Sequence, residues 1–162
     1  MKTGDDYTLL HRMLESAKTE EELSIVRKRY RELIDANENS TKRDDRFDLG
    51  WALSCLAGIE NRLGELEMAE YYYKKSVKVF DENEMPMNAA AICKTLALLF
   101  VDQERLEEAE QQLKENVRYL IKQWGKESHH VLKGQKELQD FQVMLETNSS
   151  ISSQGLRSQW GM

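Results

Sequence analysis

The sequence predicts an all-α protein, an α-solenoid of about three helix pairs followed by a C-terminal capping helix. Two observations lead to this prediction. Apolar residues recur at an interval of 40 positions, and within each repeat they step by three or four, the spacing of one face of a helix. The single proline and eight glycines exclude a collagen-like chain and a Pro/Gly-rich disordered chain.

The repeat is clearest between the stretches that begin at Leu66 and at Leu106. Adding 40 to each apolar position of the first stretch gives an apolar position of the second: Leu66, Ala69, Tyr73, Val77 and Phe80 correspond to Leu106, Ala109, Leu113, Val117 and Leu120. A weaker copy lies 43 residues upstream, and half a copy lies 42 residues downstream. The polar stretch 36–45 explains the longer upstream interval and is predicted to be a long loop.

Capping signals place the ends of the helices. Thr19 and Glu22 have the spacing of a capping box. Gly64 lies between two apolar stripes, where a helix C-terminus favours a left-handed residue, and Pro86 fits a first helical turn. Gly125 is predicted to end the longest helix. The sequence therefore predicts seven helices, over residues 5–17, 20–36, 46–62, 66–81, 87–102, 106–124 and 128–146.

These helices form one predicted domain, residues 1–146. Its repeats cover about 5–36, 46–81 and 87–124, and residues 128–146 form the capping helix. Residues 147–162 are rich in Ser, Gln and Gly, which predicts a disordered tail. The alternative is that the three large apolar residues of this tail form a short motif that docks into the protein's own groove: Ile151, Leu156 and Trp160.

Charge and cysteine content narrow the class of protein. The formal net charge of −6 argues against nucleic-acid binding, which needs a basic surface. The longest apolar run, six residues from Leu96, is far shorter than the ~20 residues of a membrane span. The acidic N-terminal stretch does not resemble a signal peptide, and Cys55 and Cys93 lie in apolar helical runs. We therefore expect a cytoplasmic protein.

Motifs for catalysis and for cofactor binding are not apparent in the sequence. Glu127 and His130 form a Glu-x-x-His pair, but a di-iron bundle needs two such pairs and two further carboxylates. A polar turn between repeats is the better interpretation. The sequence also has no zinc-binding Cys-x-x-Cys or His-Glu-x-x-His and no glycine-rich phosphate loop. We expect no cofactor, no metal and no enzymatic activity.

One repeat carries a family pattern. A Leu-Ala pair, an inter-helix glycine, a small residue, an aromatic residue and a second small residue resemble the tetratricopeptide repeat, at Leu56-Ala57, Gly64, Ala69, Tyr73 and Ser76. The next repeat keeps Leu96-Ala97, Phe100, Ala109 and Leu113 but has Asn116 where a small residue is expected. The 40-residue period is most similar to the repeats of kinesin light chains and related proteins. The resemblance covers residues 46–141 well and residues 5–36 weakly.

The resemblance implies a groove lined by the first helix of each pair. Groove positions that fit a ligand are predicted at Trp51, Asn61, Arg62, Lys94 and Leu98. Trp51 and Leu98 are expected to be partly exposed anchors, surrounded by hydrogen-bond donors. The alternative is that some of these donors face the outer surface. Ser54 and Gly58 stand where a carboxylate clamp needs Lys and Asn, which disfavours a C-terminal carboxylate as the ligand.

The resemblance therefore implies a non-enzymatic adaptor or scaffold that binds a peptide or a partner protein in this groove. The expected partner is not a nucleic acid, and the chain is not expected to span a membrane. One alternative is an assembly or regulatory subunit of a larger complex. A helical-bundle enzyme or metal protein is the less favoured alternative.

Overall fold

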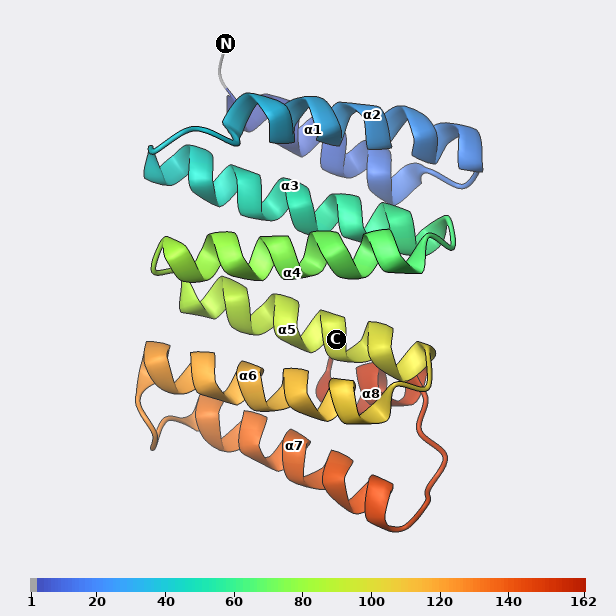
Figure 1. The fold of residues 1–162 in the computed structure, drawn as a ribbon, viewed down its shortest axis with the longest axis vertical. Helices are drawn as coiled ribbons and strands as arrows, with labels where there is room; N and C mark the ends of the chain where they lie inside the picture. Colours follow the sequence, from blue (N-terminus) through green and yellow to red (C-terminus); the bar gives the residue numbers. More distant parts are fainter. Residues whose placement is uncertain (1–2) are drawn as a thin grey trace. The chain divides into compact units, whose positions relative to one another are not determined.

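The computed structural model describes residues 3–162, with side chains from Tyr7 onward, and every regular element in this range is an α-helix (Figure 1). The chain forms two compact units, unit 1 up to Val79 and unit 2 from Phe80. The helices are α1 (Thr3–Ser16), α2 (Glu20–Asn37), α3 (Arg43–Arg62), α4 (Leu66–Glu82), α5 (Pro86–Asp102), α6 (Leu106–Trp124), α7 (His129–Glu146) and α8 (Ser153–Trp160).

The seven predicted helices are present, with ends that differ by at most three residues from the prediction. The largest difference is at the start of α3, because the loop after α2 covers only residues 38–42. Asp44 and Asp45 belong to the first turn of α3, where carboxylates stabilise the helix dipole. Ser40 Oγ also donates a hydrogen bond of 2.5 Å to Asp45 Oδ2, which holds the loop against the helix.

The short turns between helices share one backbone geometry. Gly64, Glu84 and Glu104 have φ values of 80°, 55° and 58°, so each lies in the left-handed region. After each of them, the next backbone N–H bonds a carbonyl five residues earlier, as Arg105 N does to Phe100 O at 2.9 Å. This is the Schellman pattern that ends a helix. Only the first of the three turns has the glycine that favours it.

The two units use the same side-chain hydrogen bond between their paired helices. In unit 1, Ser76 Oγ of α4 donates to Gly50 O of α3 at 2.8 Å. In unit 2, Asn116 Nδ2 of α6 donates to Ala90 O of α5 at 2.7 Å. Both bonds join residues 26 positions apart. Asn116 lies 40 positions after Ser76, and Ala90 lies 40 positions after Gly50. Asn116 therefore departs from the small-residue pattern and still preserves the contact.

The core of unit 1 lies where α2 packs against α3. Apolar residues on the facing sides of these helices are buried, among them Val26, Tyr30, Leu49, Leu53 and Leu56. The carboxylate of Glu60 is fully buried in the same interface. Its Oε1 accepts hydrogen bonds from Arg27 at 2.9 Å and from Arg31 at 3.2 Å, so two cations of α2 compensate one buried charge of α3.

In unit 2, α5 is the most enclosed helix. It packs against α6 on one side and against α8 on another, and α6 packs against α7. Because α5 is covered on several sides, it is apolar nearly all round, as the sequence predicts for a central helix. Its buried residues include Ile92, Leu96, Leu98, Leu99 and Phe100.

The C-terminal segment corrects the prediction of a disordered tail. Ser153–Trp160 form α8, which lies beside α5 in Figure 1. Ser152 caps its first turn by accepting a hydrogen bond from Gly155 N, and Gly161 ends it in the left-handed region. Leu156 and Trp160 are both buried. Tertiary packing of these two residues stabilises a helix that its polar composition does not predict.

Candidate partner-binding surfaces

The five predicted groove residues lie on the first helices of their pairs, but in different units. Trp51, Asn61 and Arg62 belong to α3 in unit 1, and Lys94 and Leu98 belong to α5 in unit 2. Unit 1 therefore has its candidate surface on α3, and unit 2 has its own candidate surface on α5.

In unit 1, Trp51 borders a pocket of about 440 Å³ between α1 and α3. The residue is 47% exposed, so about half of this large apolar side chain is accessible. Its ring meets Phe47 edge to face, with 6.5 Å between the ring centroids. This contact fixes the indole while leaving much of it accessible.

The walls of this pocket combine aromatic and polar groups. Tyr7 of α1 and Tyr30 of α2 contribute rings beside Trp51, and His11, Arg12 and Glu15 contribute polar groups from α1. His11 Nε2 lies 3.5 Å from Glu15 Oε1. An aromatic wall beside polar groups is the usual composition of a ligand site.

The deepest polar groups of the pocket are neutral near physiological pH. Burial raises the pKa of the Tyr30 hydroxyl, and the hydroxyl and the Cys55 thiol form a hydrogen bond. Burial is also the main cause of the raised pKa of Cys55. The reactive form of cysteine is the thiolate, so Cys55 acts here as a small packing group. The pocket is suited to holding an apolar side chain.

The other two predicted residues of unit 1 lie at the end of α3. Arg62 donates hydrogen bonds to the carbonyls of Leu14, at 3.1 Å, and Ala17. These carbonyls lie at the C-terminal end of α1, so the guanidinium satisfies groups that the helix leaves unpaired. Asn61 is half-buried, and its carbonyl accepts the N–H of Gly64 at 3.1 Å. The structure thus assigns contacts within the chain to both, and their binding of a partner stays a prediction.

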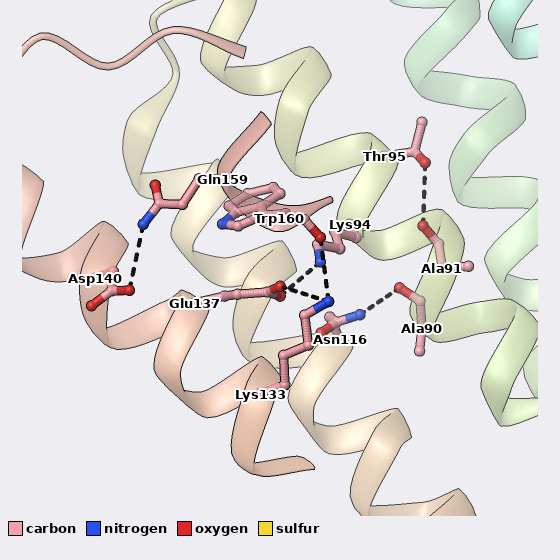
Figure 2. Close-up of polar contacts among 10 residues, drawn as sticks. All are labelled: Ala90, Ala91, Lys94, Thr95, Asn116, Lys133, Glu137, Asp140, Gln159 and Trp160. Atoms are coloured by element: carbon pink, nitrogen blue, oxygen red, sulfur yellow. Dashed lines mark hydrogen bonds and ion pairs between the residues drawn. The ribbon is translucent and has the colours of Figure 1, made fainter. Parts of the chain in front are cut away.

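In unit 2, Lys94 is the centre of a polar cluster. Its Nζ lies 2.7 Å from Glu137 Oε2 of α7 and 5.0 Å from the centre of the Trp160 ring of α8 (Figure 2). The side chains of Lys94 and Glu137 are only 15% and 11% exposed. The donor predicted to hold a ligand therefore already holds two groups of its own chain.

Leu98 differs from its prediction as an exposed anchor. The structure buries it completely, so the expectation of partial exposure is wrong. Leu98 lies one helical turn beyond Lys94 on α5, and this helix is covered by other helices of unit 2. The repeat pattern alone does not specify which helices cover α5, so it predicted an exposure for Leu98 that the packing of unit 2 removes.

The residues that complete this cluster were missed by the sequence analysis. Lys133 Nζ of α7 donates to Trp160 O at 3.4 Å, and a pocket of about 250 Å³ lies beside the cluster between α5 and α7. Glu137 and Lys133 look like ordinary surface charges in a helix sequence. Trp160 is the exception, because a large apolar residue in a polar segment indicates a side chain that docks against the protein.

In the Glu-x-x-His pair, Glu127 lies in the turn before α7 and His130 lies in the first turn of α7, and both are exposed. The His130 ring stacks on Trp124 with 5.0 Å between centroids. Among the residues whose side chains the structure describes, no cluster of three or more metal-ligating groups occurs. The expectation that the chain binds no metal stays a prediction. In the same part of the chain, no helix has the length and apolarity needed to cross a membrane.

Comparisons with known proteins find a similarity to a solved structure. The sequence matches no protein-family model, and no curated protein is significantly similar to it. The crystal structure of BtubC (BKLC) from P. vanneervenii superposes with a TM-score of 0.54 and 24% sequence identity. The match covers 75% of this chain and 53% of BtubC, so this chain spans about half of that protein's length.

The similarity concerns the fold. The chain has an all-α fold that resembles the fold of BtubC over the matched part. This confirms the predicted fold class, an all-α solenoid. The division into one repeat domain with three repeats stays a prediction.

Proposed function

We propose that the protein is a non-enzymatic adaptor that binds a peptide segment of a partner protein, with the pocket beside Trp51 as the binding site of unit 1. The observation that carries this proposal is a 47% exposed tryptophan at the rim of an aromatic pocket of about 440 Å³. The pocket lies on α1 and α3, the first helices of their pairs.

The composition of the pocket supports an apolar or aromatic side chain as the anchor of the ligand. Trp51, Tyr7 and Tyr30 offer ring surface, and the pocket volume lies within the ~300–1,000 Å³ typical of ligand sites. His11 and Arg12 lie at its border, where they can bond peptide carbonyls. Aromatic anchors of this kind dominate the binding energy of many interfaces.

The two units differ in how free this surface is. On α5, Lys94 is engaged by Glu137 and Trp160, whereas on α3 a large ring is still accessible. Unit 1 is therefore the better candidate for binding a partner without rearrangement.

Selection of peptides from a displayed library against the full-length protein tests the proposal. Selected peptides are expected to contain an aromatic or large aliphatic residue. Trp51→Ala should weaken their binding about 30-fold or more, equivalent to ~2 kcal/mol. Tyr71→Ala is the matched control, because Tyr71 is also an exposed aromatic residue of unit 1 but lies on α4, the second helix of its pair.

Two results would contradict the proposal. If Trp51→Ala leaves binding unchanged while Tyr71→Ala abolishes it, the ligand uses the second helices. If selection yields no peptide and the protein is isolated only in stoichiometric complexes that survive gel filtration, the assembly-subunit alternative is correct.

A further inference from the structure

The helix α8 has the contacts of a bound peptide ligand. Only Leu156 and Trp160, one helical turn apart, are buried, and each is 2% exposed. Most of the other residues of α8 are exposed to solvent. The helix has eight residues, too few to be stable alone in water, so it depends on the surface beneath it.

The surface beneath α8 consists of groups from α5 and α7. Lys94 lies over the Trp160 ring, and Lys133 Nζ donates to Trp160 O at 3.4 Å (Figure 2). The C-terminal end of α8, where a helix carries partial negative charge, thus meets two lysines. Gln159 Nε2 adds a bond of 3.4 Å to Asp140 Oδ2. We call this surface, comprising Lys94, Lys133, Glu137 and Asp140, the α8 seat.

The contact between α8 and its seat is incomplete. Within the described part of the chain, the buried Trp160 Nε1 has no hydrogen-bond partner, and neither has Glu137 Oε1. Lys133 Nζ lies 3.9 Å from Glu137 Oε1, too far for a hydrogen bond. Burial of a donor without an acceptor opposes docking of α8. A helix with a different aromatic residue can therefore bind the same seat more favourably.

The connection to α7 permits exchange. Residues 147–150 are exposed, and their backbone makes only turn contacts with the end of α7. Leu156 and Trp160 hold α8 in place. The linker, residues 147–150, buries no side chain against unit 2. Release of α8 therefore requires the loss of few contacts.

We propose that the α8 seat is a second peptide-binding site and that α8 is its built-in ligand. The partner it fits is a short amphipathic helix with an aliphatic residue and an aromatic residue four positions later, with its C-terminal end at Lys94 and Lys133. Such a helix displaces α8 and occupies the first-helix face of unit 2. This inference rests on the proposed function, because it treats unit 2 as another binding face of the same adaptor.

Peptide binding to an emptied seat tests the inference without any partner protein. The full-length chain carrying Leu156→Ser and Trp160→Ser keeps the linker but removes both anchors. A fluorescein-labelled peptide of residues 150–162 should bind this variant saturably in fluorescence anisotropy. The wild-type chain should bind it at least about ten-fold more weakly, because the tethered α8 competes at an effective concentration near millimolar.

Substitutions in the seat test its location. In the emptied variant, Lys94→Ala should weaken peptide binding about ten-fold, since it removes the cation over the aromatic ring. Lys122→Ala is the control, because Lys122 is an exposed lysine of α6 whose ion pair with Asp81 lies outside the seat. Equal binding of the peptide to wild-type and emptied protein, or binding to neither, overturns the inference.

A second measurement applies if the emptied variant does not fold. With Trp51→Phe and Trp124→Phe, Trp160 is the single tryptophan of an otherwise native chain and can be excited selectively at wavelengths where tyrosine does not absorb. A peptide of residues 150–162 with Trp160→Phe should shift the emission of the protein to longer wavelength as α8 is displaced, and an unshifted spectrum at millimolar peptide overturns the inference. Neither measurement involves Trp51 as a binding residue, so the pocket proposal can fail while this one stands.

Discussion

Glu104 adopts a backbone conformation that ordinary residues avoid. Its φ of 58° lies in the left-handed region, in the turn between α5 and α6. For a residue with a Cβ this conformation costs roughly 1–2 kcal/mol, whereas glycine adopts it freely. The equivalent position in the turn before α4 is Gly64, which has the same geometry.

We therefore expect Glu104→Gly to raise the free energy of unfolding by roughly 0.5–1 kcal/mol, the relief of strain minus the greater flexibility of glycine in the unfolded chain. Urea denaturation measures the change. Gln111→Gly, in the exposed middle of α6, should have the opposite effect and destabilise by up to ~1 kcal/mol. If Glu104→Gly instead lowers the free energy of unfolding, the Glu104 side chain stabilises the folded protein by more than its left-handed backbone conformation costs.

Ala109 has no accessible surface where α6 packs in unit 2, and Ala69 is equally buried in α4. A leucine at position 109 would have to displace its neighbours, which typically costs 1–3 kcal/mol. We expect Ala109→Leu to lower the melting temperature by several degrees in a circular-dichroism melt. Ala91→Leu, at an exposed position of α5, should have little effect. Equal melting temperatures would mean that Ala109 does not lie at a close helix contact.

Between elements, the buried Glu60 sets the contact of α2 with α3. Glu60 has no exposed surface, whereas the side chains of Arg27 and Arg31 are 28% and 46% exposed. Removal of both arginines leaves a carboxylate buried without compensation, which costs about 3–5 kcal/mol. Removal of Glu60 leaves two arginines that water can reach.

We therefore expect Arg27→Met with Arg31→Met to destabilise the protein several-fold more than Glu60→Met, as measured by urea denaturation. The exposed pair Arg29 and Glu32 provides the control, since Arg29→Met should change stability by less than ~1 kcal/mol. If Glu60→Met is the most damaging of these changes, the carboxylate contributes through packing and not through its charge.

The helices that the sequence predicts well are those with long amphipathic stripes. The bounds of α6 agree with the prediction, because its stripe runs unbroken from Leu106 to Trp124. The helix α8 was not predicted, because two buried residues four positions apart carry no periodic signal. Its formation depends on α5 and α7, which are distant in the sequence.

The candidate site was predicted less well than the fold. Repeat geometry places Trp51 and Lys94 on the first helices, and both lie beside pockets. It does not anticipate that Arg62 bonds the end of α1 or that Leu98 is buried. These outcomes depend on side-chain partners from other helices, which a periodic pattern does not specify.

For the whole molecule, buried hydroxyl and thiol groups make stability sensitive to alkaline pH. Burial raises the pKa of Tyr7 and Tyr30 above the ordinary value of 10.0, and it raises the pKa of Cys93 to about 12. In the unfolded chain these groups lose their protons at lower pH than in the folded protein. Their contribution to stability is therefore present below the unfolded pKa and is lost as pH rises above it.

We expect the melting temperature to fall between about pH 8.5, the ordinary pKa of cysteine, and about pH 12, because the loss continues until the folded-state pKa values are reached. Tyr30→Phe removes one of the titrating groups, so its melting temperature should fall less over this interval than that of the wild type. Tyr71→Phe, at an exposed tyrosine, should follow the wild type. An identical pH dependence in all three proteins would show that Tyr30 titrates alike in the folded and unfolded chain.

The matching hydrogen bonds of Ser76 to Gly50 and of Asn116 to Ala90 also bear on how quickly the chain folds. Each joins groups only 26 residues apart, so each closes a short loop of chain. Short loops lose little conformational entropy on closure, and domains dominated by such local contacts fold in microseconds to milliseconds. Each helix pair can thus assemble before distant parts of the chain meet, which limits the time that its apolar stripes are exposed to aggregation during synthesis.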